Sequence, residues 1–271
     1  MKQNVTSREY KVMLKKERFV GLRLGHLEQA KCFWDDFKSS ILDIVFDTDG
    51  SLNKVEKQRT ISFYDSADCY LRKNNYVFRE RVDLITARGE VTLKFRHPDR
   101  YISQDRDMSA ADAGSAKTKF EEDIKSPFIK LYSFSTKQPI PSGKVINKIK
   151  DPGELFPDLK KRLKPYDENL IINKVGGFSA REMVIEGADF QIGKNPKVEA
   201  ECGLIAWYDD NSNEQNNPIV VEFSFKYSDD HEKFDGEVAQ RAYDVFKCLQ
   251  KMTEWVDLEG TTKTAYVYSK V

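Results

Sequence analysis

The chain has 271 residues, and its 44 Lys and Arg side chains balance 44 Asp and Glu side chains, so the formal net charge is zero. This balance argues against a protein that coats nucleic acid or a membrane surface, because such proteins usually carry a basic excess. It is compatible with a local cationic pocket. Hydrophobic residues make up 39% of the chain and aromatic residues 12%, which is typical of a folded protein with an ample core.

Cysteine and histidine usage narrows the class further. The four cysteines form no CxxC pair, which predicts reduced thiols in a cytoplasmic protein. The three histidines lie far apart, so we expect no histidine-based zinc site or catalytic triad. The N-terminal stretch is polar, and no apolar run approaches the ~18–20 residues of a membrane helix. No linker or repeat divides the chain, so we expect one domain over residues 1–271.

Hydrophobic periodicity predicts the first half of the fold. Residues 8–16 alternate and predict a strand, whereas an apolar stripe at helical spacing predicts a helix over residues 26–45. Further along, we expect a strand over 60–65, a short helix or turn over 66–75, and strands over 76–84 and 90–97. Residues 99–117 are polar and rich in Ala, Ser and Asp, which predicts a mobile loop insertion.

The second half continues this pattern. We expect a strand over residues 119–125, a helical segment interrupted by prolines over 126–163, and three strands over 179–192, 197–208 and 219–227. A long amphipathic helix follows over 234–256, and a final short strand or extended tail over 263–270. The strands mostly alternate polar and apolar residues. An α+β fold is therefore predicted, an antiparallel barrel or tunnel of about eight strands around a polar lumen, with helices packed outside.

Two neighbouring strands each carry two cations two residues apart, Arg79 with Arg81 and Lys94 with Arg96. Side chains of a strand alternate faces, so each pair points the same way. Four like charges on one sheet face repel each other unless an anion lies between them. The alternative interpretation is a solvated outer face, as most charge runs are.

The polar faces of the other strands extend this set. The cations are Arg79, Arg81, Lys94, Arg96, Lys119, Arg181 and Lys263, and the carboxylates are Glu9, Glu121, Asp123, Glu201 and Glu222. Unpaired charges in a closed lumen cost several kcal/mol each and call for a compensating ligand. Arginine forks suit phosphate oxygens, and carboxylates suit Mg²⁺ or Mn²⁺. A polyphosphate held between cations and a metal ion is the ligand that this set predicts.

These motifs, in this order, resemble the CYTH superfamily, the triphosphate tunnel metalloenzymes. The resembling segments are residues 63–83, VTLKFR (91–96), KFEEDI (119–124), SAREMVI (179–185), VEAECG (198–203), VVEFSF (220–225) and TKTAYVY (262–268). That group includes thiamine triphosphatases, inorganic tripolyphosphatases, a class of adenylyl cyclases and some RNA triphosphatases. The resemblance implies a CYTH-like tunnel that covers nearly the whole chain.

The chain departs from the family where the metal is expected. The family's Glu-x-Glu-x-Lys signature corresponds here to residues 9–13, in which Lys11 replaces the second glutamate and Met13 replaces the lysine. The later acidic strand keeps Glu222 but has Ser224 where a second carboxylate is expected. Two interpretations remain open. Lys11 could supply the positive charge that a metal would supply, or Lys15, two residues after Met13 and on the same face, could replace the missing lysine.

Two functions follow from the resemblance. The first is hydrolysis of a triphosphate compound that depends on Mg²⁺ or Mn²⁺, and the second is binding of such a compound without turnover in a tunnel whose metal site has decayed.

The resemblance also implies roles for single residues. The implied phosphate-binding residues are Arg79, Arg81, Lys94, Arg96, Lys119, Arg181 and Lys11; the implied metal ligands are Glu9, Glu201 and Glu222; and the implied catalytic residues are Lys263 and Glu222. The expected partner is a small phosphorylated molecule or inorganic polyphosphate, with no membrane and no nucleic acid involved. The sequence sets no oligomeric state.

Overall fold

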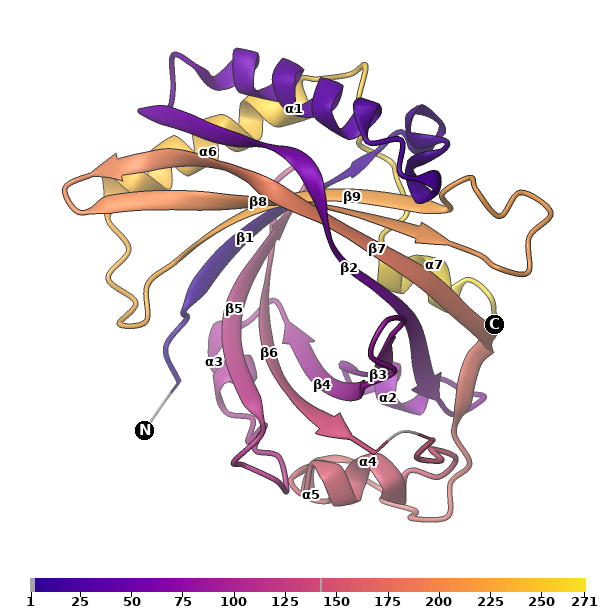
Figure 1. The fold of residues 1–271 in the computed structure, drawn as a ribbon. Helices are drawn as coiled ribbons and strands as arrows, with labels where there is room; N and C mark the ends of the chain where they lie inside the picture. The colour runs from indigo at the N-terminus through magenta and orange to yellow at the C-terminus, as the bar shows by residue number, and fades with distance from the viewer. Residues whose placement is uncertain (1–2, 142) are drawn as a thin grey trace.

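The computed structural model describes residues 3–141 and 143–271, and its main feature is a sheet that closes on itself (Figure 1). Its strands are β1 (Ser7–Leu14), β2 (Asp47–Asp65), β3 (Tyr76–Asp83), β4 (Gly89–His97), β5 (Lys117–Lys125), β6 (Ile129–Ile140), β7 (Asn173–Lys194), β8 (Lys197–Tyr208), β9 (Val220–Ser228) and β10 (Val256–Asp257). The order is β10-β1-β5-β6-β4-β3-β2-β7-β8-β9, and a further β1–β9 pairing closes the ring.

Every pairing is antiparallel except β1 with β5, which run parallel. The predicted fold class is therefore confirmed, with a sheet of ten strands in the described residues instead of about eight. The short strand β10 pairs with the end of β1 beyond the reach of β5. The ring is the tunnel architecture that the CYTH resemblance implies.

The helices are α1 (Glu28–Ile41), α2 (Tyr70–Lys73), α3 (Arg100–Gln104), α4 (Lys150–Leu155), α5 (Leu159–Arg162), α6 (Gly236–Gln250) and α7 (Lys263–Tyr268), with two 3₁₀ turns, η1 (Lys16–Phe19) and η2 (Leu22–Leu24). They lie outside the ring except α7, whose Val267 and Tyr268 pack with Phe63 and Trp207 of the lumen. Asp235 caps the start of α6 by accepting hydrogen bonds from the backbone N–H groups of Glu237 and Val238. Within the described part of the chain, no helix is both long and apolar enough to cross a membrane.

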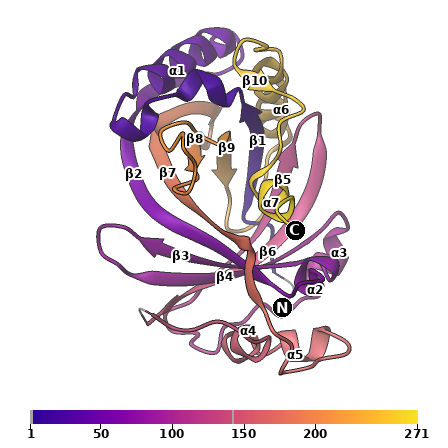
Figure 2. The same cartoon turned by 90° about the vertical axis from the view of Figure 1, so that its right-hand side faces the viewer.

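Two hydrophobic cores cover the outer face of the sheet on opposite sides. Helices α1 and α6 lie together over one side, where Phe33 and Phe37 of α1 pack edge-on against Phe223 of β9 (Figures 1 and 2). Helices α4 and α5 lie over the other side, where Phe156 packs edge-on against Phe78 of β3. Successive side chains of a strand point to opposite faces of the sheet. When one set packs under the outer helices, the residues between them therefore point into the lumen.

Three predicted elements differ from the structure. The helical segment expected over 126–163 begins with a strand, β6 over Ile129–Ile140, and helices occupy only its second half. Its residues alternate faces, and the prolines at its ends do not interrupt the ladder to β4 and β5. The predicted strand or tail over 263–270 contains helix α7, which Thr262 caps. The loop predicted over 99–117 contains α3 and buries the side chain of Met108 in the second core.

A glycine at the β2–β7 contact gives a test of this fold. Gly50 has a φ of +66°, and a Cβ atom there would lie 1.9 Å from the carbonyl oxygen of Gly187. Gly177 has a similar φ of +63° but open space around the corresponding position. We predict that Gly177→Ala lowers the free energy of unfolding by about 1–2 kcal/mol through its backbone strain alone. Gly50→Ala is expected to cost ~1–3 kcal/mol more through overpacking. Urea unfolding measures both variants. If Gly50→Ala and Gly177→Ala lose the same unfolding free energy, this packing of β2 on β7 is contradicted.

Candidate functional site

The ring encloses a charged cavity of about 210 Å³. Its lining includes the cations Lys11, Arg79, Arg81, Lys94, Arg96, Lys125 and Lys263 and the carboxylates Glu9, Glu121, Asp123 and Glu222. Cations therefore outnumber carboxylates, although the whole chain is neutral. A concave site lined by an excess of one charge concentrates ions of the opposite sign. The cavity is suited to an anion.

Strand register explains why these charges meet. Arg79 of β3 pairs with Thr92 of β4, and Arg96 of β4 pairs with Ser133 of β6, so their side chains share the inner face. The intervening residues, such as Phe78, point outward into the second core. The inference that Arg79, Arg81, Lys94 and Arg96 face one way is consistent with this arrangement, and their common face is the lumen.

Asp123 lies at the centre of the cationic set. Its carboxylate is 3.0 Å from Lys11 Nζ, 3.3 Å from Lys94 Nζ and 3.4 Å from Arg96 Nη2, and it accepts a hydrogen bond from the Ser133 hydroxyl. The residue is only 3% exposed. Burial alone would raise the pKa of Asp123, but the three cations outweigh burial and hold the pKa well below its ordinary value. The carboxylate is therefore ionised and serves as counterion to all three.

The carboxylates predicted as metal ligands are occupied by lysines. Lys11 Nζ is 2.8 Å from Glu9, and Lys263 Nζ is 2.7 Å from Glu222. Glu201 has a side chain that is 72% exposed, pairs with Lys226 at 3.0 Å and does not line the cavity. Burial would raise the pKa of Glu9, whereas Lys11 lowers it, and the net shift is downward.

This donor set does not fit a divalent ion. Mg²⁺ and Mn²⁺ need several oxygen ligands that converge on one point. In the described residues, no three side chains of the His, Cys, Asp and Glu types come together in that way. Glu9 and Glu222 each face a lysine ammonium instead, which repels a cation. Glu9, Glu201 and Glu222 are therefore not brought together as a metal site.

Arg79 and Lys125 are the cavity cations that have no ion pair in the described residues. The Nε of Arg79 is buried without a hydrogen-bond partner in the described residues, and no carboxylate there lies within ion-pair distance of it. Burial first, and then the neighbouring Arg81 guanidinium, lower the pKa of Arg79 well below its usual range. Arg81 is only loosely paired, at 3.7 Å from Glu90 and 3.9 Å from Glu182. Burial, followed by Arg96, lowers the pKa of Lys94 to about 8.

Two predicted phosphate-binding residues do not line the cavity. Arg181 pairs with Asp210 at 3.0 Å, because its register opposite Thr60 turns it away from the lumen. Lys119 shares the inner face of β5, but its side chain is about half exposed and only approaches Glu121, at 3.8 Å. The structure thus gathers the other predicted cations, Lys11, Arg79, Arg81, Lys94, Arg96 and Lys263, and leaves these two aside.

The charged residues of the inner face also include Glu182, Arg59 and Lys125, which the sequence pattern does not predict. Glu182 follows Arg181 and turns inward, where it pairs with Arg59 and accepts a 2.9 Å hydrogen bond from the Trp207 indole. Burial would raise its pKa, but Arg81 and Arg59 lower it to about 2. Lys125 also lines the cavity. Glu121 and Asp123 are two residues apart on β5, and the same spacing applied once more along this strand would predict Lys125 on the inner face.

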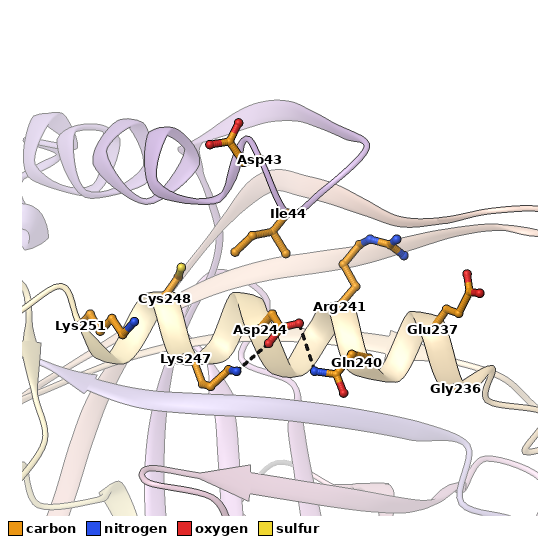
Figure 3. A pocket seen from close by; sticks show the side chains of 10 residues that line it. All are labelled: Asp43, Ile44, Gly236, Glu237, Gln240, Arg241, Asp244, Lys247, Cys248 and Lys251. Atoms are coloured by element: carbon orange, nitrogen blue, oxygen red, sulfur yellow. Dashed lines mark hydrogen bonds and ion pairs between the residues drawn. The ribbon is translucent and has the colours of Figure 1, made fainter.

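A larger hollow of about 690 Å³ lies outside the ring, between α6 and the segment after α1 (Figure 3). Asp244 accepts hydrogen bonds from Lys247, at 2.7 Å, and from Gln240, at 3.1 Å (Figure 3). Arg241 donates a hydrogen bond to the Ile192 carbonyl, and the other charged side chains that line the hollow are exposed to solvent. The hollow therefore makes no comparable demand for a ligand.

Comparisons with known proteins show likeness in structure only. No protein-family model and no curated protein matches the chain. A solved structure from Hippeastrum, described as a candidate adenylyl cyclase with a dominant triphosphatase activity, is 12% identical; the match covers 98% of this chain and 96% of that one, with a TM-score of 0.46. Candidate adenylate cyclases from Vibrio parahaemolyticus and Bacillus halodurans are 10% and 13% identical, with TM-scores of 0.37 and 0.39.

The matches span nearly the full length of the compared chains, with 99% and 100% coverage for the Vibrio protein and 92% of each chain for the Bacillus protein. Their identities are too low to transfer a residue's role. The fold assignment rests on the closed sheet itself, and the site on its own contacts.

The contacts of Asp123 generate a direct prediction. Asp123→Asn leaves Lys11, Lys94 and Arg96 without their shared charge, and breaking a buried pair in this way costs about 3–5 kcal/mol of unfolding free energy. Glu201→Gln is the matched control, because its exposed ion pair contributes less than ~1 kcal/mol. Urea unfolding measures both. Equal effects of the two substitutions would show that Asp123 does not hold the cationic wall together.

Proposed function

We propose that this protein binds the triphosphate or polyphosphate chain of a small molecule inside the tunnel, without a divalent metal ion. The observation that carries the proposal is Arg79, a partly exposed residue whose Nε is buried without a hydrogen-bond partner in the described residues, beside the loosely paired Arg81. An uncompensated buried charge costs several kcal/mol, and an anionic ligand removes that cost. Arginine forks match phosphate oxygens with two parallel hydrogen bonds, which makes a phosphate chain the best-suited anion.

The cavity dimensions support a narrow ligand. About 210 Å³ is less than the ~300–1,000 Å³ typical of pockets for whole organic ligands. A linear phosphate chain would contact Arg79 and Arg81 on β3 and Lys94 on β4. Lys263 would approach it from the start of α7, held in place by Glu222. Any organic group on the phosphate would lie outside this cavity.

Binding without metal-dependent turnover is the alternative that the donor set favours. Metal-dependent hydrolysis needs free carboxylates, whereas Glu9 and Glu222 already pair with lysines. Lys11 lies between Glu9 and Asp123, where its ammonium supplies positive charge as a metal would. This position favours Lys11 over Lys15 as the substitute, since Lys15 does not line the cavity. The cytoplasm remains the proposed location, on the strength of the cysteine pattern.

Removing Arg79 should separate stability from binding. Arg79→Met replaces a partly exposed charge that has no ion pair with an apolar chain, so we expect the ligand-free protein to gain stability, by less than the ~1–4 kcal/mol found when buried ion pairs are replaced. The same substitution should abolish most of the stabilisation by triphosphate. That stabilisation is about 2.7 kcal/mol for the unsubstituted protein at ~100 times the dissociation constant. Thermal unfolding with and without triphosphate measures both effects.

Arg181→Met is the matched control for this experiment. It removes an arginine from the outer face of β7, so triphosphate should stabilise this variant as much as it stabilises the unsubstituted protein. The proposal fails if triphosphate stabilises neither the unsubstituted protein nor the control. It also fails if Arg79→Met leaves the triphosphate effect intact.

The lowered pKa of Lys94 predicts pH-dependent binding. The charges around it are the cations Arg96 and Lys11 and the carboxylates Asp123 and Glu121. With a free-protein pKa of about 8, Lys94 is protonated below pH 8 and loses its charge above it. A phosphate chain favours the protonated form, so binding should take up a proton above pH 8 and weaken as pH rises, by up to about tenfold per unit.

Calorimetric titrations with triphosphate between pH 7 and 9.5 measure this dependence. Lys94→Arg keeps the charge throughout this range and should flatten the profile. Comparing the variant with the unsubstituted protein cancels the ligand's own ionisation, which is common to both. Identical pH profiles for the two proteins would exclude Lys94 from the binding site.

A further inference from the structure

The turn between β3 and β4 exposes two apolar side chains to solvent. The turn extends outward from the ring (Figure 2), and in it Ile85 is 85% exposed and Leu84 is 40% exposed. Among the large hydrophobic residues that the structure describes, Ile85 is the most exposed. Turns usually carry glycine or short polar side chains at such positions. Single apolar residues are nevertheless common on protein surfaces, so the meaning of Ile85 depends on its surroundings.

Hydrogen bonds hold this turn in one conformation. The carboxylate of Asp83 accepts hydrogen bonds from the backbone N–H groups of Ile85, at 3.0 Å, and Thr86, at 2.7 Å. The backbone N–H of Leu84 donates to the carbonyl of Gln58 on the neighbouring strand β2, at 3.0 Å. The turn is therefore attached to the sheet, and its apolar tip is presented outward.

A basic cavity lies directly beside the turn. It has a volume of about 390 Å³, and Asp83, Thr86 and Arg88 of the turn are part of its lining. Its cations are Lys57, Arg59, Arg81, Arg88, Lys117 and Lys137, against the carboxylates Asp83 and Glu90. Because Arg81 also lines the tunnel cavity, we call this second cavity the vestibule. The whole chain is neutral, so the basic excess is local.

Half of the vestibule's cations have no counterion in the protein. Within residues 3–141 and 143–271, no carboxylate forms an ion pair with Lys57, Arg88 or Lys117, and all three residues are exposed. Glu90 already serves two other cations, at 3.7 Å each. The carboxylate of Asp83 is held by the backbone of its own turn. The three exposed cations are therefore available to an external anionic surface.

An apolar tip beside unpaired cations suits the surface of an anionic bilayer. Basic side chains are attracted to its negatively charged headgroups, and apolar side chains gain by entering the boundary between headgroups and acyl chains. Single-stranded nucleic acid would instead need aromatic rings on which its bases stack. No aromatic side chain of the described residues lines the vestibule.

We propose that this face of the protein docks on an anionic phospholipid bilayer. Ile85 and Leu84 insert between the headgroups, while Lys57, Arg88 and Lys117 contact the lipid phosphates. None of these five residues lines the tunnel cavity, so the inference is independent of the proposed function. It differs from the sequence expectation of no membrane partner, which rested on the net charge of the whole chain. Docking places the opening of the tunnel next to the bilayer.

Co-sedimentation with lipid vesicles tests the apolar contact. We expect the protein to bind phosphatidylcholine vesicles that contain phosphatidylserine, more weakly at high salt, and not vesicles of phosphatidylcholine alone. Ile85→Ser should weaken this binding by about tenfold, because the inserted apolar area is lost. Ile129→Ser is the matched control. Ile129 is 52% exposed and pairs with Lys125, at the opposite end of β5 from Lys117, so its substitution should leave binding unchanged.

A charge variant tests the basic contact. Each basic side chain near an anionic membrane contributes about fivefold in affinity, so removing three should weaken vesicle binding roughly 100-fold. The variant combines Lys57→Gln, Arg88→Gln and Lys117→Gln. Its control combines Lys130→Gln, Lys233→Gln and Lys251→Gln, at exposed positions that line neither the vestibule nor the tunnel cavity. The control should bind vesicles like the unsubstituted protein. Thermal unfolding checks that every variant remains folded.

Four outcomes would overturn the docking assignment. The first is no binding to phosphatidylserine vesicles at low salt, and the second is equal binding by Ile85→Ser and Ile129→Ser. The third is equal binding by the two charge variants. The fourth is binding of soluble polyglutamate as tight as that of the vesicles, which would make an acidic protein the partner.

Triphosphate titration keeps this inference separate from the proposed function. Ile85→Ser should bind triphosphate like the unsubstituted protein, because Ile85 does not line the tunnel cavity. A loss of triphosphate binding in this variant would assign the turn to the tunnel site and overturn the docking assignment. If the unsubstituted protein binds vesicles but no triphosphate, the proposed function fails and the docking surface stands.

Discussion

One buried carboxylate, that of Asp123, holds together a wall of like charges. Lys11 comes from β1, and Lys94 and Arg96 both come from β4; each would repel the others if this shared partner were absent. The closed sheet brings them together, because their apolar neighbours along β1 and β4 pack outward and turn these alternate side chains into the lumen. The position of Asp123 is therefore a condition for the ring to close around a cationic lumen.

The same constraint explains what the lumen lacks. Lys11 pairs with Glu9 and Asp123, and Lys263 pairs with Glu222, so the predicted metal ligands of the lumen each face a lysine. The charge imbalance then falls on Arg79, further along the inner face. A protein that buries a charge without a partner gives up stability that a ligand can restore. In the proposed function, Lys11 supplies the positive charge that a metal would supply and Arg79 binds an anion, and both roles follow from one charge distribution.

Periodicity was enough to find the cationic face but not to orient every strand. The spacing of two places Arg79 and its neighbours on one face, and packing of the alternate residues makes that face the inner one. The same rule fails on β7, where Arg181 was chosen and Glu182 points inward, because a strand's period does not state which face is buried. The sequence predicts a helical segment over 126–163, but residues 129–140 form a strand, because the alternation of mixed polar and aromatic residues is a weak signal without its paired strands β4 and β5.

The central claim is that this tunnel binds a phosphate chain with its own cations and no metal. Calorimetric titration of triphosphate into the protein in the presence of EDTA tests it most directly. We expect saturable binding under these conditions, with no gain in affinity when EDTA is replaced by saturating Mg²⁺ or Mn²⁺. Binding that appears only with the divalent ion would contradict the account, because it would show that Lys11 and Lys263 do not take the place of a metal.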